Sequence, residues 1–282
     1  EKELGANPYK MGVVAGADFH SGYQGNEEFN YKGGHGFIDD TPGKRLDPTP
    51  GLSGGRTAEL SSAGTTAVWA EENTRAGIWN GMMSKETYGT SGTLIRLRFF
   101  GGWDFPKDLV NQDDFVKKAY ETGVPMGQDL PKMASKAPTF AVWALKDPES
   151  GNLDRIQIIK AWPNPANGLP MEKIYDVVWS DEDKRQIGED GKLPAVGNTV
   201  DIKKATYSND SIGASQLRAV WTDPDFDPTN SAAYYVRVLE IPTPRWSTYD
   251  AAKLGVAPPD FVPATIQERA WSSPIWYTPA AK

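Results

Sequence analysis

The sequence predicts an α+β protein in two parts: a strand-and-helix part over residues 1–90 and an antiparallel, β-rich, sandwich-like domain over residues 91–282. Two observations support this division. Up to residue 90, two short apolar runs and one helical pattern are separated by a long irregular connection. Beyond it, runs rich in β-branched and aromatic residues recur between clusters of Pro, Gly, Asn and Asp. A boundary is therefore expected near Ser91-Gly92.

Length, charge and composition narrow the function classes. The chain has 282 residues, a net charge of -7 and no cysteine. Without a basic run, nucleic acid is not an expected partner. No apolar segment approaches the roughly 20 residues that cross a bilayer, so no membrane partner is expected either. The missing cysteines exclude disulfides and thiolate nucleophiles without separating cytosol from periplasm, and any metal must be held by His, Asp, Glu or water.

The first apolar run, residues 12–17, predicts a buried strand that ends in Asp18-Phe19-His20. Alternation along a strand puts Asp18 and His20 on the same face. In parallel α/β sheets, ligands and metals collect at the carboxyl ends of strands. The pair therefore supplies one oxygen and one nitrogen suited to a Zn, Mn or Fe ion. The alternative, which is the commoner outcome for an isolated Asp-x-His, is a surface pair satisfied by hydrogen bonds.

Residues 21–64 form a long irregular connection, and connections of this length are more often functional than decorative. His35, one of only two histidines, is a candidate catalytic residue here, with a solvated loop position as the equal alternative. The pattern Gly51-Leu-Ser53-Gly-Gly55 matches a nucleophile elbow, but no strand precedes it and no helix follows. It is therefore interpreted as a turn.

Residues 65–70 predict a second strand, followed by a turn and a helix capped by Asn73 or Thr74. Glu71 would lie at the carboxyl end of that strand, level with Asp18 if the two strands are parallel, and is a candidate catalytic residue. Arg75 is a further candidate because a guanidinium suits an anionic substrate oxygen. The alternative for Glu71 is the acidic first turn of a helix.

The second part is expected to contain a short helix at residues 113–122 and strands at 93–100, 139–145, 155–162, 173–179, 217–221 and 234–241. The Pro-rich segment 242–282 is expected to wrap over the protein and bury its three Trp rings. The carboxylates of Asp223, Asp225 and Asp227 are spaced like the start of a calcium loop, but Pro228 and Tyr234 replace the required Gly and Glu. They are interpreted as Asp-Pro turns.

Several segments together resemble a known family: Asn7-Pro-Tyr-Lys-Met-Gly12, Asp18-Phe-His20, Val68-Trp-Ala-Glu-Glu-Asn-Thr-Arg75, Glu86-Thr-Tyr-Gly-Thr-Ser-Gly92, Lys173-Ile-Tyr-Asp-Val-Val-Trp179 and Ser273-Pro-Ile-Trp-Tyr-Thr-Pro279. In this order they look like successive landmarks of the bacterial proteins called domain of unknown function 3604. That family is similar to the PHP metallohydrolases, named for polymerase and histidinol phosphatase.

The resemblance implies a distorted β/α barrel that holds two or three divalent metal ions at the carboxyl ends of its strands and hydrolyses phosphate esters. An Asp-x-His after a late strand is one of its ligand motifs, which assigns Asp18 and His20 to metal binding. The early His-x-His motif and the middle ligands have no counterpart, because His20 and His35 are the only histidines. The chain therefore looks like the carboxyl-terminal portion of a longer protein, with residues 1–90 as the end of the barrel.

One Asp and one His cannot complete a catalytic metal site. The isolated chain is therefore expected to bind metal weakly and not to catalyse. The expected partners are the missing amino-terminal portion of the barrel, or a second copy of the chain, and a small anionic substrate. The alternative is a non-catalytic β-rich module that binds carbohydrate or protein, although most of the ten Trp lie in apolar strand patterns where burial is the default.

Overall fold

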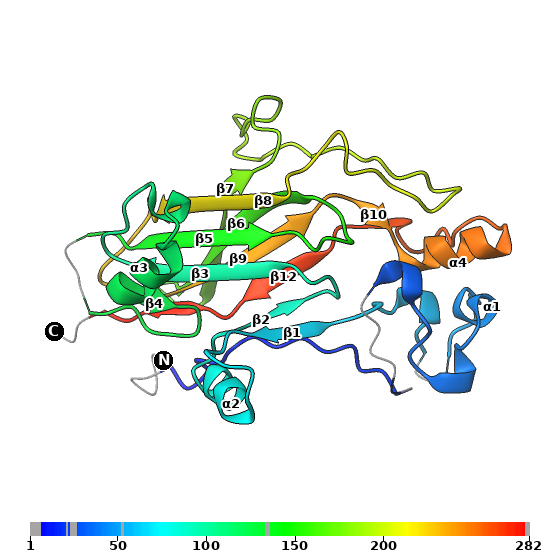
Figure 1. Ribbon diagram of the computed structural model, residues 1–282, viewed down its shortest axis with the longest axis horizontal. Helices are drawn as coiled ribbons and strands as arrows, with labels where there is room; N and C mark the ends of the chain where they lie inside the picture. Colours follow the sequence, from blue (N-terminus) through cyan, green and yellow to red (C-terminus); the bar gives the residue numbers. More distant parts are fainter. Residues whose placement is uncertain (1–6, 21, 23–26, 52–53, 133–135, 280–282) are drawn as a thin grey trace.

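The computed structural model describes residues 7–20, 22, 27–51, 54–132 and 136–279, and antiparallel sheets dominate them (Figure 1). The first sheet has the spatial order β1 (Thr65–Val68), β2 (Thr87–Thr90), β12 (Arg269–Ser272), β9 (Ala232–Glu240), β6 (Leu153–Pro163), β7 (Pro170–Trp179), and β13 (Ile275–Tyr277) also pairs with β9. The second has the order β4 (Gly123–Pro125), β3 (Arg96–Gly102), β5 (Thr139–Leu145), β8 (Gln216–Thr222). Strands β10 (Thr243–Pro244) and β11 (Thr265–Ile266) form a small pair. The predicted α+β class with a β-rich antiparallel part is confirmed, whereas the end of a β/α barrel expected at residues 1–90 is not, because β1 and β2 pair antiparallel.

The two large sheets share one hydrophobic core. Ile158 of β6 and Val236 of β9 lie in it with Phe99 of β3 and Phe140 of β5. The ring of Phe140 is 4.5 Å from that of Tyr234, centroid to centroid, across the two sheets. Burial of each such side chain contributes about 1.5–3 kcal/mol. This packing agrees with the sandwich-like arrangement expected for the second part of the chain.

The helices are short: α1 (Pro42–Arg45), α2 (Arg75–Met83), α3 (Phe115–Thr122), α4 (Trp246–Leu254) and the 3-10 turns Glu28–Asn30, Gly36–Ile38, Thr57–Glu59 and Leu109–Asn111. Helix α2 begins as predicted, because the Thr74 hydroxyl accepts a hydrogen bond of 3.0 Å from Gly77 N. Helix α3 packs on the outer face of the second sheet against Phe100. No helix in these residues is long and apolar enough to span a membrane.

Helices α1 and α4 lie together at one end of the molecule and form a lobe with residues 27–51 and 54–62 (Figure 1). Its small core contains Tyr31, Ala58 and the fully buried Trp246. Trp276, further along the carboxyl-terminal segment, is also buried, and Trp271 is half-buried. The expected burial of the rings is therefore found for Trp246 and Trp276 and in part for Trp271. The expected wrapping over the protein is wrong, because β12 of this segment lies inside the first sheet between β2 and β9.

The prediction of a strand at residues 12–17 is wrong. This segment is extended and half-buried but pairs with no strand, because hydroxyl side chains take its backbone groups. Val13 N donates to Ser273 Oγ (2.8 Å) and Val13 O accepts from Thr87 Oγ1 (2.8 Å). Ala15 N and O are both bonded to Thr66 Oγ1, at 2.9 and 2.7 Å. The apolar run therefore lies on the side chains of β1, β2 and the turn after β12 instead of joining a sheet.

Strands β1 and β2 pair antiparallel, and β2 also pairs with β12 from the end of the chain. The sheet thus continues across Ser91-Gly92, and the division into two parts at that point stays a prediction. The close approach of the segment over this sheet depends on glycine. A Cβ at Gly89 would lie 2.8 Å from the Cβ of Ala15, which is closer than real Cβ atoms come.

Candidate functional site

Asp18 and His20 converge at the end of the extended segment. Asp18 Oδ1 lies 3.5 Å from His20 Nε2, with 98% and 63% of the two side chains exposed. Strand alternation is not what brings them together. Asp18 has a φ of 54°, which lies in the left-handed region that Asp tolerates. The resulting bend in the backbone brings the side chains of Asp18 and His20 together. His20 N donates to Gly34 O at 2.7 Å, which fixes the pair to the loop that carries His35.

His35 lies beside this pair. The rings of His20 and His35 are 4.9 Å apart between centroids, in an edge-to-face arrangement. His35 Nδ1 faces Asp39 Oδ2 at 3.5 Å. The fully buried Asp39 carboxylate also accepts hydrogen bonds from His35 N (2.8 Å) and Gly34 N (2.9 Å), so it holds both the loop and the imidazole. Three predicted residues therefore meet, and Asp39 joins them.

The sequence analysis missed Asp39, although its spacing of four residues from His35 is a local signal. A carboxylate that orients a histidine ring is a common support of both metal-binding and proton-transferring histidines. We define Asp18, His20, His35 and Asp39 as the histidine cluster.

The histidine cluster fits a metal ion only in part. Two donors that bind one ion at about 2.1 Å with a tetrahedral angle are about 3.4 Å apart, close to the separation between Asp18 Oδ1 and His20 Nε2. Within the described residues, however, no group of three or more His, Asp or Glu side chains is placed to hold a metal ion. Asp18 and His20 therefore form a two-donor set that further ligands must complete.

Glu71 and Arg75 are not brought to this cluster. The extended segment passes Gly64 and Thr66, at the start of β1, whereas Glu71 and Arg75 follow the other end of that strand. In Figure 1, α2 and the lobe with α1 lie at opposite ends of β1. Both side chains are exposed. Glu71 could lie level with Asp18 only if both residues followed parallel strands. The segment that carries Asp18 is not a strand.

Glu71 instead lines a separate open cavity of about 1130 Å³. At its wall, the Arg98 guanidinium lies 3.3 Å from the centre of the Trp69 ring and 3.4 Å from Glu86 Oε1. Burial raises the pKa of the Glu86 carboxyl. The Tyr120 hydroxyl donates to Glu86 as well, so the charge of Arg98 is already matched inside the protein.

A third, small cavity has an interior of about 30 Å³ below an open mouth and is lined mainly by acidic and aromatic side chains. Its lining residues are Glu27, Glu28, Phe29, Thr93, Asp147, Glu149, Ser150, Tyr207, Thr243, Tyr249 and Glu268. We call it the acidic cavity. Glu240 lies directly behind it, because its carboxylate accepts a hydrogen bond from the Ser150 hydroxyl.

Burial raises the pKa of three of these carboxyls. The pKa of Glu240 rises to about 8, that of Glu268 lies well above its usual range, and that of Glu28 is also raised. The sequence analysis missed all three. Glu240 did carry a signal, since it shares the buried register of β9 with Val236 and Val238. A charged residue in a core-facing register is unusual and marks a polar site.

One comparison decides the family. A family model with the description "Protein of unknown function (DUF3604)" matches residues 1–279. The chain belongs to this family. No curated protein and no solved structure matches it. The family resemblance seen in the sequence is thereby confirmed, and the chemistry must be argued from the residues.

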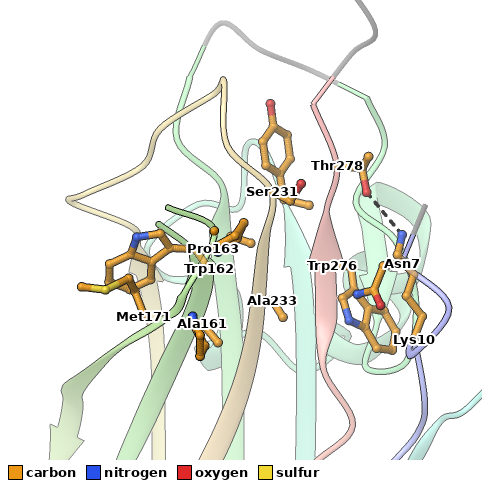
Figure 2. A pocket seen from close by; sticks show the side chains of 14 residues that line it. Asn7, Lys10, Ala161, Trp162, Pro163, Met171, Ser231, Ala233, Trp276 and Thr278 are labelled. Carbon is orange, nitrogen blue, oxygen red and sulfur yellow. Dashed lines mark hydrogen bonds between the residues drawn. The ribbon is translucent and has the colours of Figure 1, made fainter. Parts of the chain in front are cut away.

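The DUF3604 chain also has an apolar groove of about 710 Å³ near its two ends (Figure 2). Trp162 and Met171 lie on one side of it, and Trp276 and Lys10 on the other. Lys10 Nζ donates to Thr278 Oγ1 at 3.3 Å. The groove combines apolar walls with few polar groups, which is the usual composition of a small-molecule pocket.

Two weaker sequence patterns of the DUF3604 chain, at residues 223–227 and 51–55, remain to be compared with the structure. Asp223 is buried against Lys160 Nζ (2.7 Å), and Asp225 contacts Lys173. Asp227 accepts a hydrogen bond of 2.8 Å from Thr229 N, as in an Asx turn. These carboxylates serve turns and ion pairs, as the interpretation without calcium expected. In the elbow-like pattern at 51–55, Leu52 and Ser53 lie outside the described residues.

Proposed function

We propose that this DUF3604 chain supplies the Asp-x-His ligands of a PHP-like, metal-dependent hydrolase that acts on phosphate esters. The observation that carries the proposal is the separation of 3.5 Å between Asp18 Oδ1 and His20 Nε2 at an exposed edge of the protein. An ion-paired carboxylate and imidazole also reach this separation, so the metal test below decides between the two arrangements. A shared cation accounts for it because two ligands of one tetrahedral ion lie about 3.4 Å apart.

In this proposal the residues of the histidine cluster have separate tasks. Asp18 and His20 bind the ion, which is Zn, Mn or Fe. His35 lies against His20, and Asp39 fixes its ring through Nδ1, which suits a histidine that moves a proton near the substrate. A bound divalent ion supplies Lewis acidity toward the phosphate ester. Glu71 and Arg75 are secondary candidates for contacts with parts of an anionic substrate distant from the ion.

The remaining ligands come from outside the chain in this proposal. We propose that the amino-terminal portion of a PHP-like barrel, or a second copy of the chain, completes the site. A catalytic ion needs about three protein ligands and an open position. The isolated 282-residue chain is therefore expected to bind metal weakly and to lack turnover.

The test compares native protein that contains this chain with two variants, Asp18→Asn and His20→Gln. Intact mass shows whether another polypeptide travels with the chain, elemental analysis gives the metal content, and p-nitrophenyl phosphate reports hydrolysis. Each variant is expected to lose metal affinity and rate by about a hundredfold or more. Asp40→Asn is the matched control, because Asp40 is half-exposed in the same lobe and pairs with Lys44 at 2.8 Å.

Two results would contradict the proposal. Full metal content and rate in both variants would remove Asp18 and His20 from the site. Rapid metal-dependent turnover by the isolated chain would show that no ligands from outside the chain are needed. That result would contradict the proposal that Asp18 and His20 form an incomplete ligand set.

The groove in Figure 2 favours a second candidate, a non-catalytic module that binds carbohydrate. Half-buried Trp162 offers a ring face beside Met171, and sugars stack on such faces. Glycan titrations followed by Trp emission, with Trp162→Leu as the groove variant and Trp79→Leu as the control at an exposed ring outside it, test this candidate. No change in emission with any glycan would refute it.

A further inference from the structure

A second cavity adjoins the apolar groove of Figure 2. Each of the two has an interior of about 290 Å³ below its open mouth, and both are lined by Trp162, Ser231 and Ala232. Two adjoining spaces of this size fall within the range of about 300–1,000 Å³ that small-molecule sites occupy. We call the two cavities together the Trp162 groove, with an apolar half in Figure 2 and a polar half in the second cavity.

The apolar half has small side chains between two Trp rings. Trp276 of β13 is paired with Ala233 of β9, and Ala233 with Ala161 of β6, in the register of the sheet. Residues directly opposite one another in antiparallel strands share a face, so these side chains lie in one row. Figure 2 shows Trp276 on one side of the groove and Trp162 with Met171 on the other. The two alanines leave open the space that larger side chains would fill.

The polar half places donors beside acceptors. Lys160 of β6 and Lys173 of β7 are opposite one another in the sheet. The buried Lys160 ammonium contacts Asp223 Oδ2 and donates to Asp225 O, both at 2.7 Å. Lys173 is half-exposed and donates to the Asp225 carboxylate, which also accepts a hydrogen bond of 2.7 Å from the Tyr175 hydroxyl. Each ammonium therefore lies beside an aspartate carboxylate.

These groups can make further hydrogen bonds. Lys173 Nζ has three donors, and among the described residues it donates to the Asp225 carboxylate alone. Asn230 donates through Nδ2 to a backbone carbonyl at 2.9 Å, while no described residue donates to its side-chain oxygen. Hydrogen bonds from Lys173 and from Thr229 lower the pKa values of Asp225 and Asp227, so both carboxylates are ionised at neutral pH and can accept from a ligand.

We propose that the Trp162 groove binds a neutral oligosaccharide of at least two sugar units, with one unit against the Trp162 ring and the next in the polar half. This proposal rests on the second candidate function given above and names its ligand class. A sugar ring offers an apolar face to an aromatic ring, and each of its hydroxyls both donates and accepts. Neighbouring hydroxyls therefore match an ammonium and a carboxylate that lie side by side, as those of Lys173 and Asp225 do.

Charge favours a neutral ligand over an acidic or a basic one. At the polar half there are two lysines, Lys160 and Lys173, and three aspartates, Asp223, Asp225 and Asp227. A uronate or a sulfate would add charge of the sign that is already in excess. A basic ligand would compete with the two lysines for their carboxylates, and the buried Lys160 would be costly to leave unpaired. A hydroxyl leaves both ion pairs in place.

The experiment is calorimetry of the full chain with glucose, mannose, maltotetraose, cellotetraose, mannotetraose and tetragalacturonate. We expect saturable binding of at least one neutral tetrasaccharide, about tenfold or more tighter than that of its monosaccharide. Equal affinity for the two would overturn the requirement for two units. Binding of tetragalacturonate as tight as that of the neutral tetrasaccharides would overturn the neutral ligand class but leave the second candidate function in place. No binding of any of these sugars would overturn both.

Variants place the ligand in the two halves. Trp162→Leu and Asp225→Asn are each expected to weaken tetrasaccharide binding about tenfold to a hundredfold. Asn230→Ala leaves the ion pair of Asp225 in place and tests the polar half independently. Asp201→Asn is the matched control, because Asp201 also pairs with a lysine, Lys204 at 3.7 Å, and lines neither cavity. Thermal unfolding of each variant checks the fold. Folded Asp225→Asn and Asn230→Ala proteins that bind like the parent would confine the sugar to the apolar half and overturn the proposal.

Discussion

Replacement of Glu240 by Gln tests whether the acidic cavity controls stability. Glu240 is fully buried at the end of β9, and burial raises its pKa from 4.5 to about 8. A carboxyl whose pKa is higher in the folded than in the unfolded protein contributes stability at pH values below the unfolded value. That contribution is lost as the pH rises through the folded value. Without a bound cation, the protein should therefore become less stable between about pH 4.5 and about pH 8.

The magnitude follows from the shift. One pKa unit corresponds to about 1.4 kcal/mol, so a shift from 4.5 to about 8 gives an upper bound of about 5 kcal/mol for Glu240 alone. Glu268 and Glu28 add losses of the same sign. Gln has nearly the same shape and no charge to ionise. In Glu240→Gln, the free energy of unfolding should therefore depend less on pH, by the ionisation of one carboxyl. The variant should be more stable than the parent at about pH 8.

The assay is urea unfolding at pH values from about 5 to about 9, which gives the free energy of unfolding at each pH. Glu189→Gln serves as the control for a change at an exposed carboxylate. The reasoning is refuted if Glu240→Gln and the parent show parallel curves, because Glu240 then ionises equally in the folded and unfolded chains.

Three further predictions concern the packing. Ser273→Ala leaves Val13 N without its partner at 2.8 Å and should lower stability by about 1–3 kcal/mol; a urea midpoint equal to the parent's would mean that the hydroxyl is dispensable. Lys160→Met leaves Asp223 buried without its cation and should cost about 3–5 kcal/mol, much of which a second change of Asp223 to Leu should restore. Trp79 is the one exposed Trp among the described residues, at 61%, so Trp79→Phe should shift the Trp emission to shorter wavelength; an unchanged spectrum would contradict this placement.

Much of the fold could be predicted because its signals are local. The runs at 139–145, 155–162 and 217–221 fall within β5, β6 and β8, and the helical pattern at 113–122 contains α3. These elements alternate or repeat apolar residues against one core, so their period can be read from neighbouring positions. Thr74 was a local signal too, since capping depends on residues three apart.

The extended segment at 12–17 could not be predicted in the same way. Its composition is that of a buried strand, but a strand also needs a free edge to pair with. Here the hydroxyls of Thr66, Thr87 and Ser273 provide its hydrogen bonds. These partners are 51 to 260 residues away from the groups that they bind. No local pattern specifies such contacts.

The two candidate sites also differ in whether their residues are close together in the sequence. Asp18 and His20 are two positions apart, and their convergence could be expected from spacing, although a bend at Asp18 and not strand alternation produces it. The acidic cavity draws its carboxyls from residues 27–28, 147–149, 240 and 268, so only the folded chain assembles it. The one sequence signal for this cavity was Glu240, a charged residue in the core-facing register of β9.

One segment, residues 27–39, contributes side chains to both the histidine cluster and the acidic cavity. Residues 27–39 carry Glu28 at one end and Asp39 at the other, with Tyr31 between them. The ring of Tyr31 is 4.4 Å from that of Trp246, whose backbone N donates to Glu28, and 5.8 Å from that of Phe19, which lies next to Asp18 and His20 in the chain. After burial, the negative charge of Asp39 is the largest cause of the raised pKa of Tyr31, and Glu28 adds to it. A change in the charge of Glu28 therefore acts on Tyr31, whose ring packs on that of Phe19, the residue between Asp18 and His20. Since coupling between two sites is reciprocal, protonation of Glu28 should change the affinity of the proposed metal site at Asp18 and His20 by the same factor as the metal changes the proton affinity of Glu28.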